Sequence, residues 1–267
     1  MLYNFNGSYS QKPALEPTNR SFLYGDGFFE SMCLFNGQLF NKKHHIRRIQ
    51  DSLSALCLEL DVSASDLVYQ VEELAQKNDL STASSARLSV FRNEGGLYTP
   101  STKTASFLIN VRANSQQSFA LSDGISLGLC TNFNKMAQPL SFLKSSSALT
   151  YVMASIEKQK QGFDELILLN QFSKVVEVTN ANIFIVKGNR FYTPPLSDGG
   201  VDGTMRALLM DHFSHEEKSF TVEDAIEADE IILCNYKGIR WVNKFMTSDH
   251  YVNHKSIEIV SLLNTLI

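Results

Sequence analysis

Apolar residues recur along the chain with two periods, one typical of strands and the other of helices. The run 28–35 is largely apolar and ends at Asn36-Gly37, a dipeptide that favours the tight turn of a β-hairpin. A helix is expected after Ser63, which can cap its N-terminus. The elements predicted for this part of the chain are a strand at 28–35, helices at 43–58 and 63–77, and strands at 86–92 and 105–111.

The remaining pattern predicts a second unit that is richer in strands. The expected elements are helices at 147–161 and 204–213 and strands at 125–131, 166–169, 175–178, 183–186 and 231–234. The apolar run 166–169 predicts a buried strand, whereas 175–178 and 183–186 are expected to pair across a short turn. The polar stretch 114–122 has no clear period and predicts a linker between domains at 1–113 and 123–267. The expected fold class is α+β (α/β), with two domains.

Composition and charge argue against several classes of protein. The chain has 267 residues, of which 43% are hydrophobic and 19% charged, so it can bury a substantial core. A net charge of −4 gives no support for nucleic-acid binding, and no basic leader or transmembrane-length apolar run indicates a membrane protein. The four cysteines form no CxxC pair, so we expect free, buried thiols in a cytoplasmic protein and no metal site.

Three segments together indicate a specific kind of binding site, although each segment alone is a weak signal. Lys144 lies among serines after an apolar pair, Glu177 lies on a strand of valines, and Gly203-Thr204-Met205-Arg206 begins a helix. Taken singly, each has an ordinary explanation: a surface lysine, an outward-facing glutamate, and one helix start among many. Together they match the needs of pyridoxal phosphate, which are an amine, a carboxylate for the pyridine nitrogen, and helix N–H groups for the phosphate. Arg48 or Arg47 can supply a cation for the same phosphate.

The order of these segments resembles the fold type IV pyridoxal phosphate enzymes, the class-IV aminotransferase family. The similarity runs from about residue 20 to about residue 240. The matching segments are Tyr24-Gly25-Asp26-Gly27-Phe28-Phe29-Glu30, His45-Ile46-Arg47-Arg48-Ile49, Lys144, Glu177, Asn180-Ala181-Asn182-Ile183-Phe184, Tyr192-Thr193-Pro194 and Gly203-Thr204-Met205-Arg206. As a set they are highly specific for the family.

The resemblance implies an architecture and a set of roles. It implies a homodimer in which each chain has a small N-terminal α/β domain and a larger C-terminal β-barrel-like α/β domain, with pyridoxal 5′-phosphate between them. Lys144 is then the Schiff-base lysine and the acid and base of catalysis, and Glu177 is the partner of the pyridine nitrogen. Arg48, rather than Arg47, is the phosphate ligand. The remaining cofactor contacts that we expect are Asn182, Gly203, Thr204, Met205 and Asn235.

The chain departs from the transaminase patterns at positions that are expected to lie near the substrate. The D-amino acid enzymes carry an arginine and a histidine where this chain has Leu97 and Thr99, and their strand tyrosine is Phe29 here. The branched-chain enzymes carry a tyrosine five residues after the lysine, where this chain has Leu149. The segments at 203–206 and 233–235 instead resemble aminodeoxychorismate lyase, although the asparagine that the lyase has three residues after the lysine is Ser147 here. The lyase arginine that follows the glycine pair is also absent.

These comparisons predict a lyase that converts 4-amino-4-deoxychorismate into 4-aminobenzoate and pyruvate, a step of folate biosynthesis. The expected partner is a small anionic substrate, and Phe29, Arg92 and Tyr98 are the residues expected to face it. One alternative is a class-IV aminotransferase that acts on D- or branched-chain amino acids with 2-oxoglutarate. A second is a protein that binds pyridoxal phosphate without efficient turnover.

Overall fold

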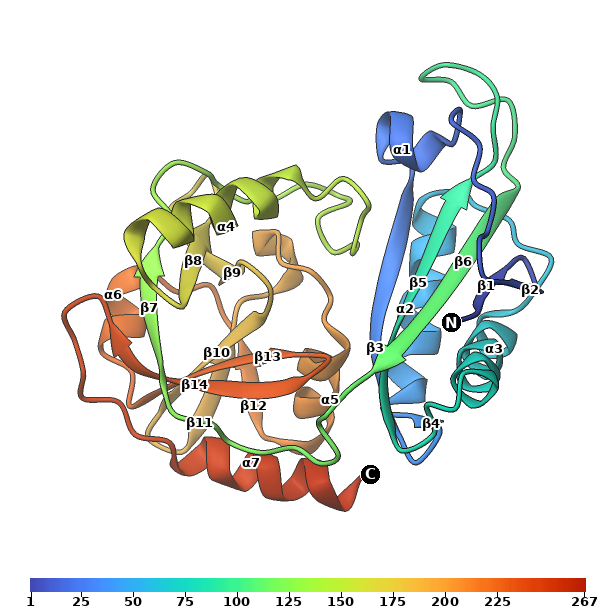
Figure 1. Cartoon of the computed structure of the whole chain (residues 1–267). Helices are drawn as coiled ribbons and strands as arrows, with labels where there is room; N and C mark the ends of the chain where they lie inside the picture. Colours follow the sequence, from blue (N-terminus) through green and yellow to red (C-terminus); the bar gives the residue numbers. More distant parts are fainter. The chain divides into compact units, whose positions relative to one another are not determined.

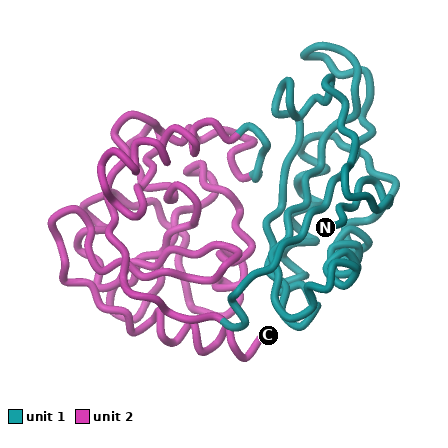
Figure 2. The backbone as a smooth tube through the Cα atoms, viewed as in Figure 1, with its two compact units in different colours: residues 1–118, 143–147, 267 teal, residues 119–142, 148–266 magenta.

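The computed structural model describes residues 1–267 and divides them into two compact units, which Figure 2 distinguishes by colour. The first unit contains Met1–Ser118, Leu143–Ser147 and Ile267, and the second contains Phe119–Phe142 and Ala148–Leu266. The short segment Leu143–Ser147 therefore belongs to the N-terminal unit although the chain on both sides of it belongs to the other. The predicted domain limits on either side of 114–122 stay a prediction.

The first unit is built on a six-stranded sheet in the order β2-β1-β6-β5-β3-β4, and every neighbouring pair is antiparallel (Figure 1). Its strands are β1 (Tyr3–Phe5), β2 (Ser8–Ser10), β3 (Gly27–Phe35), β4 (Gln38–Leu39), β5 (Ala83–Arg92) and β6 (Ala105–Ala113). Its helices are α1 (Arg20–Tyr24), α2 (Lys42–Ala55) and α3 (Ala64–Lys77). The hairpin predicted at Asn36-Gly37 joins β3 to β4, and both residues have positive φ.

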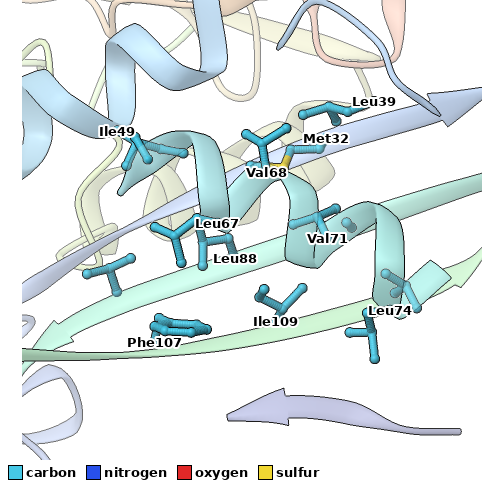
Figure 3. Close-up of a cluster of buried hydrophobic side chains, with 14 of the residues drawn as sticks. Met32, Leu39, Ile49, Leu67, Val68, Val71, Leu74, Leu88, Phe107 and Ile109 are labelled. Carbon is cyan, nitrogen blue, oxygen red and sulfur yellow. The ribbon is translucent and has the colours of Figure 1, made fainter. Parts of the chain in front are cut away.

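The core of this unit lies between the sheet and the helices α2 and α3 (Figure 3). Leu67 and Val71 of α3 and Leu88 of β5 are completely buried there. The predicted cap of α3 is confirmed: the Ser63 side chain accepts from the Asp66 N–H, and the Asp66 carboxylate accepts from the Ser63 N–H. This capping box satisfies two N–H groups that a helix N-terminus otherwise leaves without partners.

The second unit is built on an eight-stranded mixed sheet that forms a half-barrel, in the order β12-β11-β10-β13-β14-β7-β8-β9. Its strands are β7 (Ile125–Leu129), β8 (Glu165–Leu169), β9 (Val175–Val178), β10 (Asn182–Lys187), β11 (Arg190–Thr193), β12 (His215–Glu217), β13 (Glu230–Asn235) and β14 (Gly238–Phe245). Its helices are α4 (Leu149–Gln161), α5 (Thr204–His212), α6 (Val222–Ile226) and α7 (His254–Thr265), with a 3₁₀ turn at Leu196–Asp198. β7 and β8 are parallel, and the connection between them contains α4. The predicted α+β class is confirmed.

Two predictions are wrong. The strands 175–178 and 183–186 do not pair, because β11 and β13 occupy both edges of β10 while β9 pairs with β8. Only one backbone bond, from the Val178 N–H to the Ala181 carbonyl, spans the turn between them. The second wrong prediction is that all four cysteines are buried. All four are free, but Cys57 is exposed, because it lies in the turn after α2 with φ +50°.

None of the helices is both long enough and apolar enough to cross a membrane.

Replacing Leu67 by Ala should lower the free energy of unfolding by about 3 kcal/mol, because the deleted methyl groups leave a cavity in a fully buried site. A urea titration followed by circular dichroism measures this difference. The matched control is Tyr69→Ala on the same helix, where the side chain is 66% exposed, and it should change the value by less than about 0.5 kcal/mol. Equal losses in the two variants would contradict the core described for this unit.

Candidate functional site

Backbone hydrogen bonds hold Lys144 against strand β3. The Phe29 N–H donates to the Lys144 carbonyl at 2.9 Å, and the Ser146 N–H donates to the Gly27 carbonyl at 3.0 Å. The segment thus acts as a short antiparallel strand on one edge of β3. Gly25 allows this approach, since a Cβ at its φ of +67° would lie 3.1 Å from the Ser147 Cβ. These two hydrogen bonds therefore hold the main chain around Lys144 against β3.

The side chain of Lys144 is half-buried and lies beside the ring of Phe29. Its Nζ is 4.5 Å from the centroid of that ring, and the Cζ of Arg87 is 3.7 Å from the same centroid. Both distances are within the range of a cation–π interaction. An amine and an exposed guanidinium therefore share one aromatic ring. The sequence pattern did not single out Arg87, which lies on β5 and is brought to Phe29 by the pairing of β5 with β3.

Arg48 of α2 is buried and forms a bidentate ion pair with Glu30 of β3. Its Nε and Nη2 donate to the two Glu30 oxygens at 2.7 and 2.6 Å, and the His45 Nδ1 lies 2.6 Å from Oε2. Burial alone would raise the pKa of Glu30, but the Arg48 charge and the His45 contact outweigh it and lower that pKa to about 2. Glu30 thus fixes the orientation of the predicted phosphate ligand.

Arg92 is also buried, and the donors of its guanidinium point into the fold of the first unit. Its Nε donates to Asp26 at 3.0 Å, its Nη2 to the Leu56 carbonyl at 2.6 Å, and its Nη1 to the carbonyls of Cys57 and Thr102. Asp26 also accepts from Arg20. The geometry therefore gives Arg92 a role in holding the loop after β5, whereas its contact with the substrate stays a prediction.

The same loop is held from its other side by Arg20, whose Nη1 donates to the carbonyls of Gly95, Gly96 and Leu97 at 3.1, 3.1 and 2.7 Å. Tyr98 follows directly, and it is 90% exposed with its ring 5.6 Å from that of Tyr24. The loop thus has a fixed base and an exposed aromatic end. Arg20 was not recognised in the sequence, since a single arginine carries no signal.

In the second unit, Glu177 lies on β9, all four residues of which are buried. Its carboxylate is 3% exposed and accepts from the Tyr151 hydroxyl at 2.5 Å, from the Val201 N–H at 3.0 Å and from the Asn182 Nδ2 at 3.5 Å. A buried carboxylate needs such donors to remain stable. The simplest explanation of the sequence, an outward-pointing glutamate on a half-exposed strand, is thereby excluded.

Helix α5 begins at Thr204, as predicted, with Gly203 as its N-cap and no side chain capping it. The amide of Asn182 lies against this point and donates to the Val201 carbonyl at 2.8 Å. A Cβ on Gly203 would lie 1.8 Å from the Asn182 Oδ1, so no side chain fits there. The N–H groups and the positive dipole end of α5 suit an anion. Thr204 and Met205 are both buried at this helix start.

Asn235, at the end of β13, fixes the turn that precedes Asn182. Its Nδ2 donates to the Asn180 carbonyl at 3.2 Å, while its Oδ1 accepts from the Lys237 N–H at 2.9 Å. Arg240 donates to the Asn180 side chain at 2.8 Å. Both the main chain and the side chain of Asn180 in the turn between β9 and β10 are thereby held. This positions Glu177 and Asn182, which lie on either side of the turn.

The chain resembles known proteins both in sequence and in structure. The family model for amino-transferase class IV matches residues 27–244. A Methanocaldococcus jannaschii protein with a provisional name as a branched-chain-amino-acid aminotransferase is 30% identical over 88% of this chain and 83% of its own length. An aminodeoxychorismate lyase of Vibrio harveyi is 27% identical over 81% and 82%. The crystal structure of 4-amino-4-deoxychorismate lyase from Pseudomonas aeruginosa superimposes with a TM-score of 0.85 at 25% identity, over 99% of this chain and 98% of that one.

The ion pair of Glu30 predicts a dependence of stability on acid pH. Its folded-state pKa of about 2 lies below the ordinary 4.5, so its contribution is complete above 4.5 and is lost as the pH falls from there toward about 2. We expect the free energy of unfolding to fall by roughly 3 kcal/mol from this group over that window. Urea titrations from about neutral pH to about pH 2 measure the slope.

The Glu30→Gln variant should be less stable at neutral pH, because it leaves the Arg48 charge buried, and should lose most of that slope. The matched control is Glu59→Gln, whose side chain is 68% exposed and whose slope should equal that of the unchanged protein. Parallel pH curves for Glu30→Gln and the unchanged protein would show that Glu30 is not the titrating group.

Proposed function

Because this chain belongs to the class-IV aminotransferase family, whose cofactor is pyridoxal 5′-phosphate, we propose that it converts 4-amino-4-deoxychorismate into 4-aminobenzoate and pyruvate. One observation carries the choice of substrate: the Lys144 amine and the Arg87 guanidinium both contact the Phe29 ring, at 4.5 and 3.7 Å from its centroid. A six-membered cyclic substrate with an amino group at one end and a carboxylate at the other matches this arrangement.

The side chains present fit the cofactor. Glu177 is buried and accepts from the Tyr151 hydroxyl and the Val201 N–H, and a protonated pyridine nitrogen is a further donor that suits such a carboxylate. No side chain caps the N-terminus of α5 at Gly203, so the first N–H groups and the positive dipole end of this helix suit a phosphate. The residues proposed to hold the cofactor are Lys144, Glu177, Arg48, Asn182, Gly203, Thr204, Met205 and Asn235.

Pyridoxal phosphate, when bound, supplies an aldehyde that condenses with amines and a protonated ring that withdraws electrons. In the proposed reaction, Glu177 keeps the ring nitrogen protonated and Arg48 contributes positive charge toward the phosphate. Lys144 Nζ takes the proton from C4 of the substrate, the carbon that carries the amino group, while the C3–O bond to the enolpyruvyl group breaks. Lys144 then gives that proton to the terminal methylene carbon of the leaving group, which becomes pyruvate.

The substrate side of the proposal differs from the sequence-based expectation in one respect. Phe29 and Tyr98 remain candidates for contact with the ring, but Arg92 is bonded to Asp26 and to backbone carbonyls. We therefore assign the substrate carboxylate to Arg87 and the shape of the loop to Arg92 and Arg20. Phe29 has no hydroxyl, so it offers this substrate an aromatic surface without a competing hydrogen-bonding group. Homodimerisation and a cytoplasmic location stay predictions from the sequence.

A second candidate is a class-IV aminotransferase, which the 30% identity to the Methanocaldococcus jannaschii protein favours. An aminotransferase transfers the amino group to a 2-oxo acid and so cannot complete a cycle without an acceptor. The lyase needs no acceptor, because the proton and both fragments come from one substrate. This difference separates the two candidates in a single assay.

Purified protein supplied with pyridoxal phosphate and 4-amino-4-deoxychorismate should release 4-aminobenzoate and pyruvate in equal amounts without a 2-oxo acid. Liquid chromatography measures the first product and a lactate dehydrogenase assay the second. The Lys144→Ala variant should produce neither, since it lacks both the amine and the proton carrier. Amine transfer that depends on 2-oxoglutarate would establish the aminotransferase instead, and no product from any substrate would favour a binding protein.

The Arg87→Gln variant should raise KM for the same substrate by about tenfold or more, because it removes a charge-assisted bond to a carboxylate. Steady-state rates of 4-aminobenzoate formation measure this change. The matched control is Arg190→Gln, which changes an exposed arginine of β11 and should leave KM unchanged. An unchanged KM in Arg87→Gln would remove Arg87 from the substrate site and leave the cofactor assignment as it is.

A further inference from the structure

Tyr151 is a partner of Glu177 that the sequence pattern did not single out. It lies on α4, seven positions after Lys144 in the sequence, and its hydroxyl donates to the Glu177 Oε1 at 2.5 Å. The other oxygen, Oε2, accepts from the Val201 N–H at 3.0 Å. Two different elements therefore each supply a donor to one oxygen, and the carboxylate plane is fixed by the pair.

We propose that Tyr151 is a positioning residue for the cofactor, which holds the Glu177 carboxylate ionised and oriented so that it retains the proton on the pyridine nitrogen. This inference rests on the proposed pairing of Glu177 with that nitrogen. Hydrogen bonds to a carboxylate favour its charged form. Loss of the phenol makes transfer of the ring proton to Glu177 easier, and an unprotonated ring is a weaker electron acceptor.

The phenol is suited to remain a neutral donor. Burial, together with the nearby Glu177 charge, raises the pKa of Tyr151 well above 10.0, so the hydroxyl keeps its proton at any ordinary pH. The side chain also has only two rotatable bonds, so fixing the hydroxyl costs little conformational entropy. A serine or threonine on α4 lacks the length to reach the strand from the same position.

The positive charge of Lys135 lies near both Tyr151 and Glu177. The Nζ of Lys135 lies 5.1 Å from the centroid of the Tyr151 ring and donates to the Ser141 carbonyl at 3.2 Å. Burial lowers the pKa of Lys135, and the nearby Glu177 charge opposes part of that change, so the two side chains interact electrostatically. Tyr151 thus lies in contact with both the carboxylate and the ammonium group. We infer that Lys135 offsets part of the cost of burying the Glu177 charge.

The test measures the protonation of the cofactor's ring nitrogen and the affinity of the protein for the cofactor. Protein is loaded with pyridoxal phosphate labelled with ¹⁵N in the ring, and the nitrogen chemical shift is recorded by NMR for the unchanged protein, Tyr151→Phe, Glu177→Gln and the double variant. Fluorescence titration gives the dissociation constant of pyridoxal phosphate. In Tyr151→Phe the nitrogen signal should move toward its unprotonated position, and the dissociation constant should rise about tenfold. Glu177→Gln should move the signal further.

In the Glu177→Gln background, adding Tyr151→Phe should produce no additional shift, because the tyrosine acts through that carboxylate. The matched control is Tyr251→Phe, which removes a buried hydroxyl from the same unit, where it donates to the Ala225 and Ile226 carbonyls. This variant should leave the nitrogen chemical shift and the dissociation constant of pyridoxal phosphate unchanged even if it lowers the stability of the protein.

An unchanged nitrogen signal in Tyr151→Phe, together with a shifted one in Glu177→Gln, overturns the role of the tyrosine and leaves the cofactor pairing intact. An unchanged signal in both variants overturns the pairing of Glu177 as well. A further shift in the double variant also overturns the inference, since the tyrosine then acts by another route. The lyase proposal is judged separately, by the products.

Discussion

A carboxylate taken out of water has to be compensated by donors or cations, and each unit of this chain places one such group beside its candidate chemistry. In the first unit, Glu30 is compensated by Arg48 and His45, and this fixes α2 against β3. In the second, Glu177 is compensated by Tyr151 and by the Val201 N–H, and this links α4 and the loop before α5 to β9. The elements around both sites are positioned by these requirements.

The two carboxylates are compensated differently, and the difference suits their proposed tasks. Glu30 faces a full positive charge, so its own charge is neutralised and it serves to orient Arg48. The Tyr151 hydroxyl and the Val201 N–H are uncharged donors, and they orient the Glu177 carboxylate. A carboxylate oriented in this way suits the proposed pairing with a protonated ring nitrogen. The proposal for Tyr151 follows from the same reasoning.

The helices and strands that the sequence predicts correctly are those with local signals, such as the Ser63 cap and the Asn36-Gly37 turn. Contacts between distant positions have no such signal. Tyr151 meets Glu177 across 26 positions, and the Lys144 segment pairs with β3 across more than a hundred, as the 2.9 Å bond to Phe29 shows. The strand pairing expected for 175–178 was wrong for the same reason, because the periodic pattern does not specify which edges are already occupied. The proposed cofactor roles of Lys144 and Glu177 come from the chemistry and order of their segments and from the resemblance to the family, and not from periodicity.

The placement of Leu143–Ser147 in the first unit has a consequence for protein synthesis. Domains of a growing chain usually fold in the order in which they leave the ribosome. When Ser118 has emerged, the edge of β3 at Gly27–Phe29 still lacks the segment that pairs with it, since that segment follows only after the first strand of the other unit. An unpaired strand edge invites association with other chains. The segment that contains Lys144 therefore closes that edge only once Ser147 has been added.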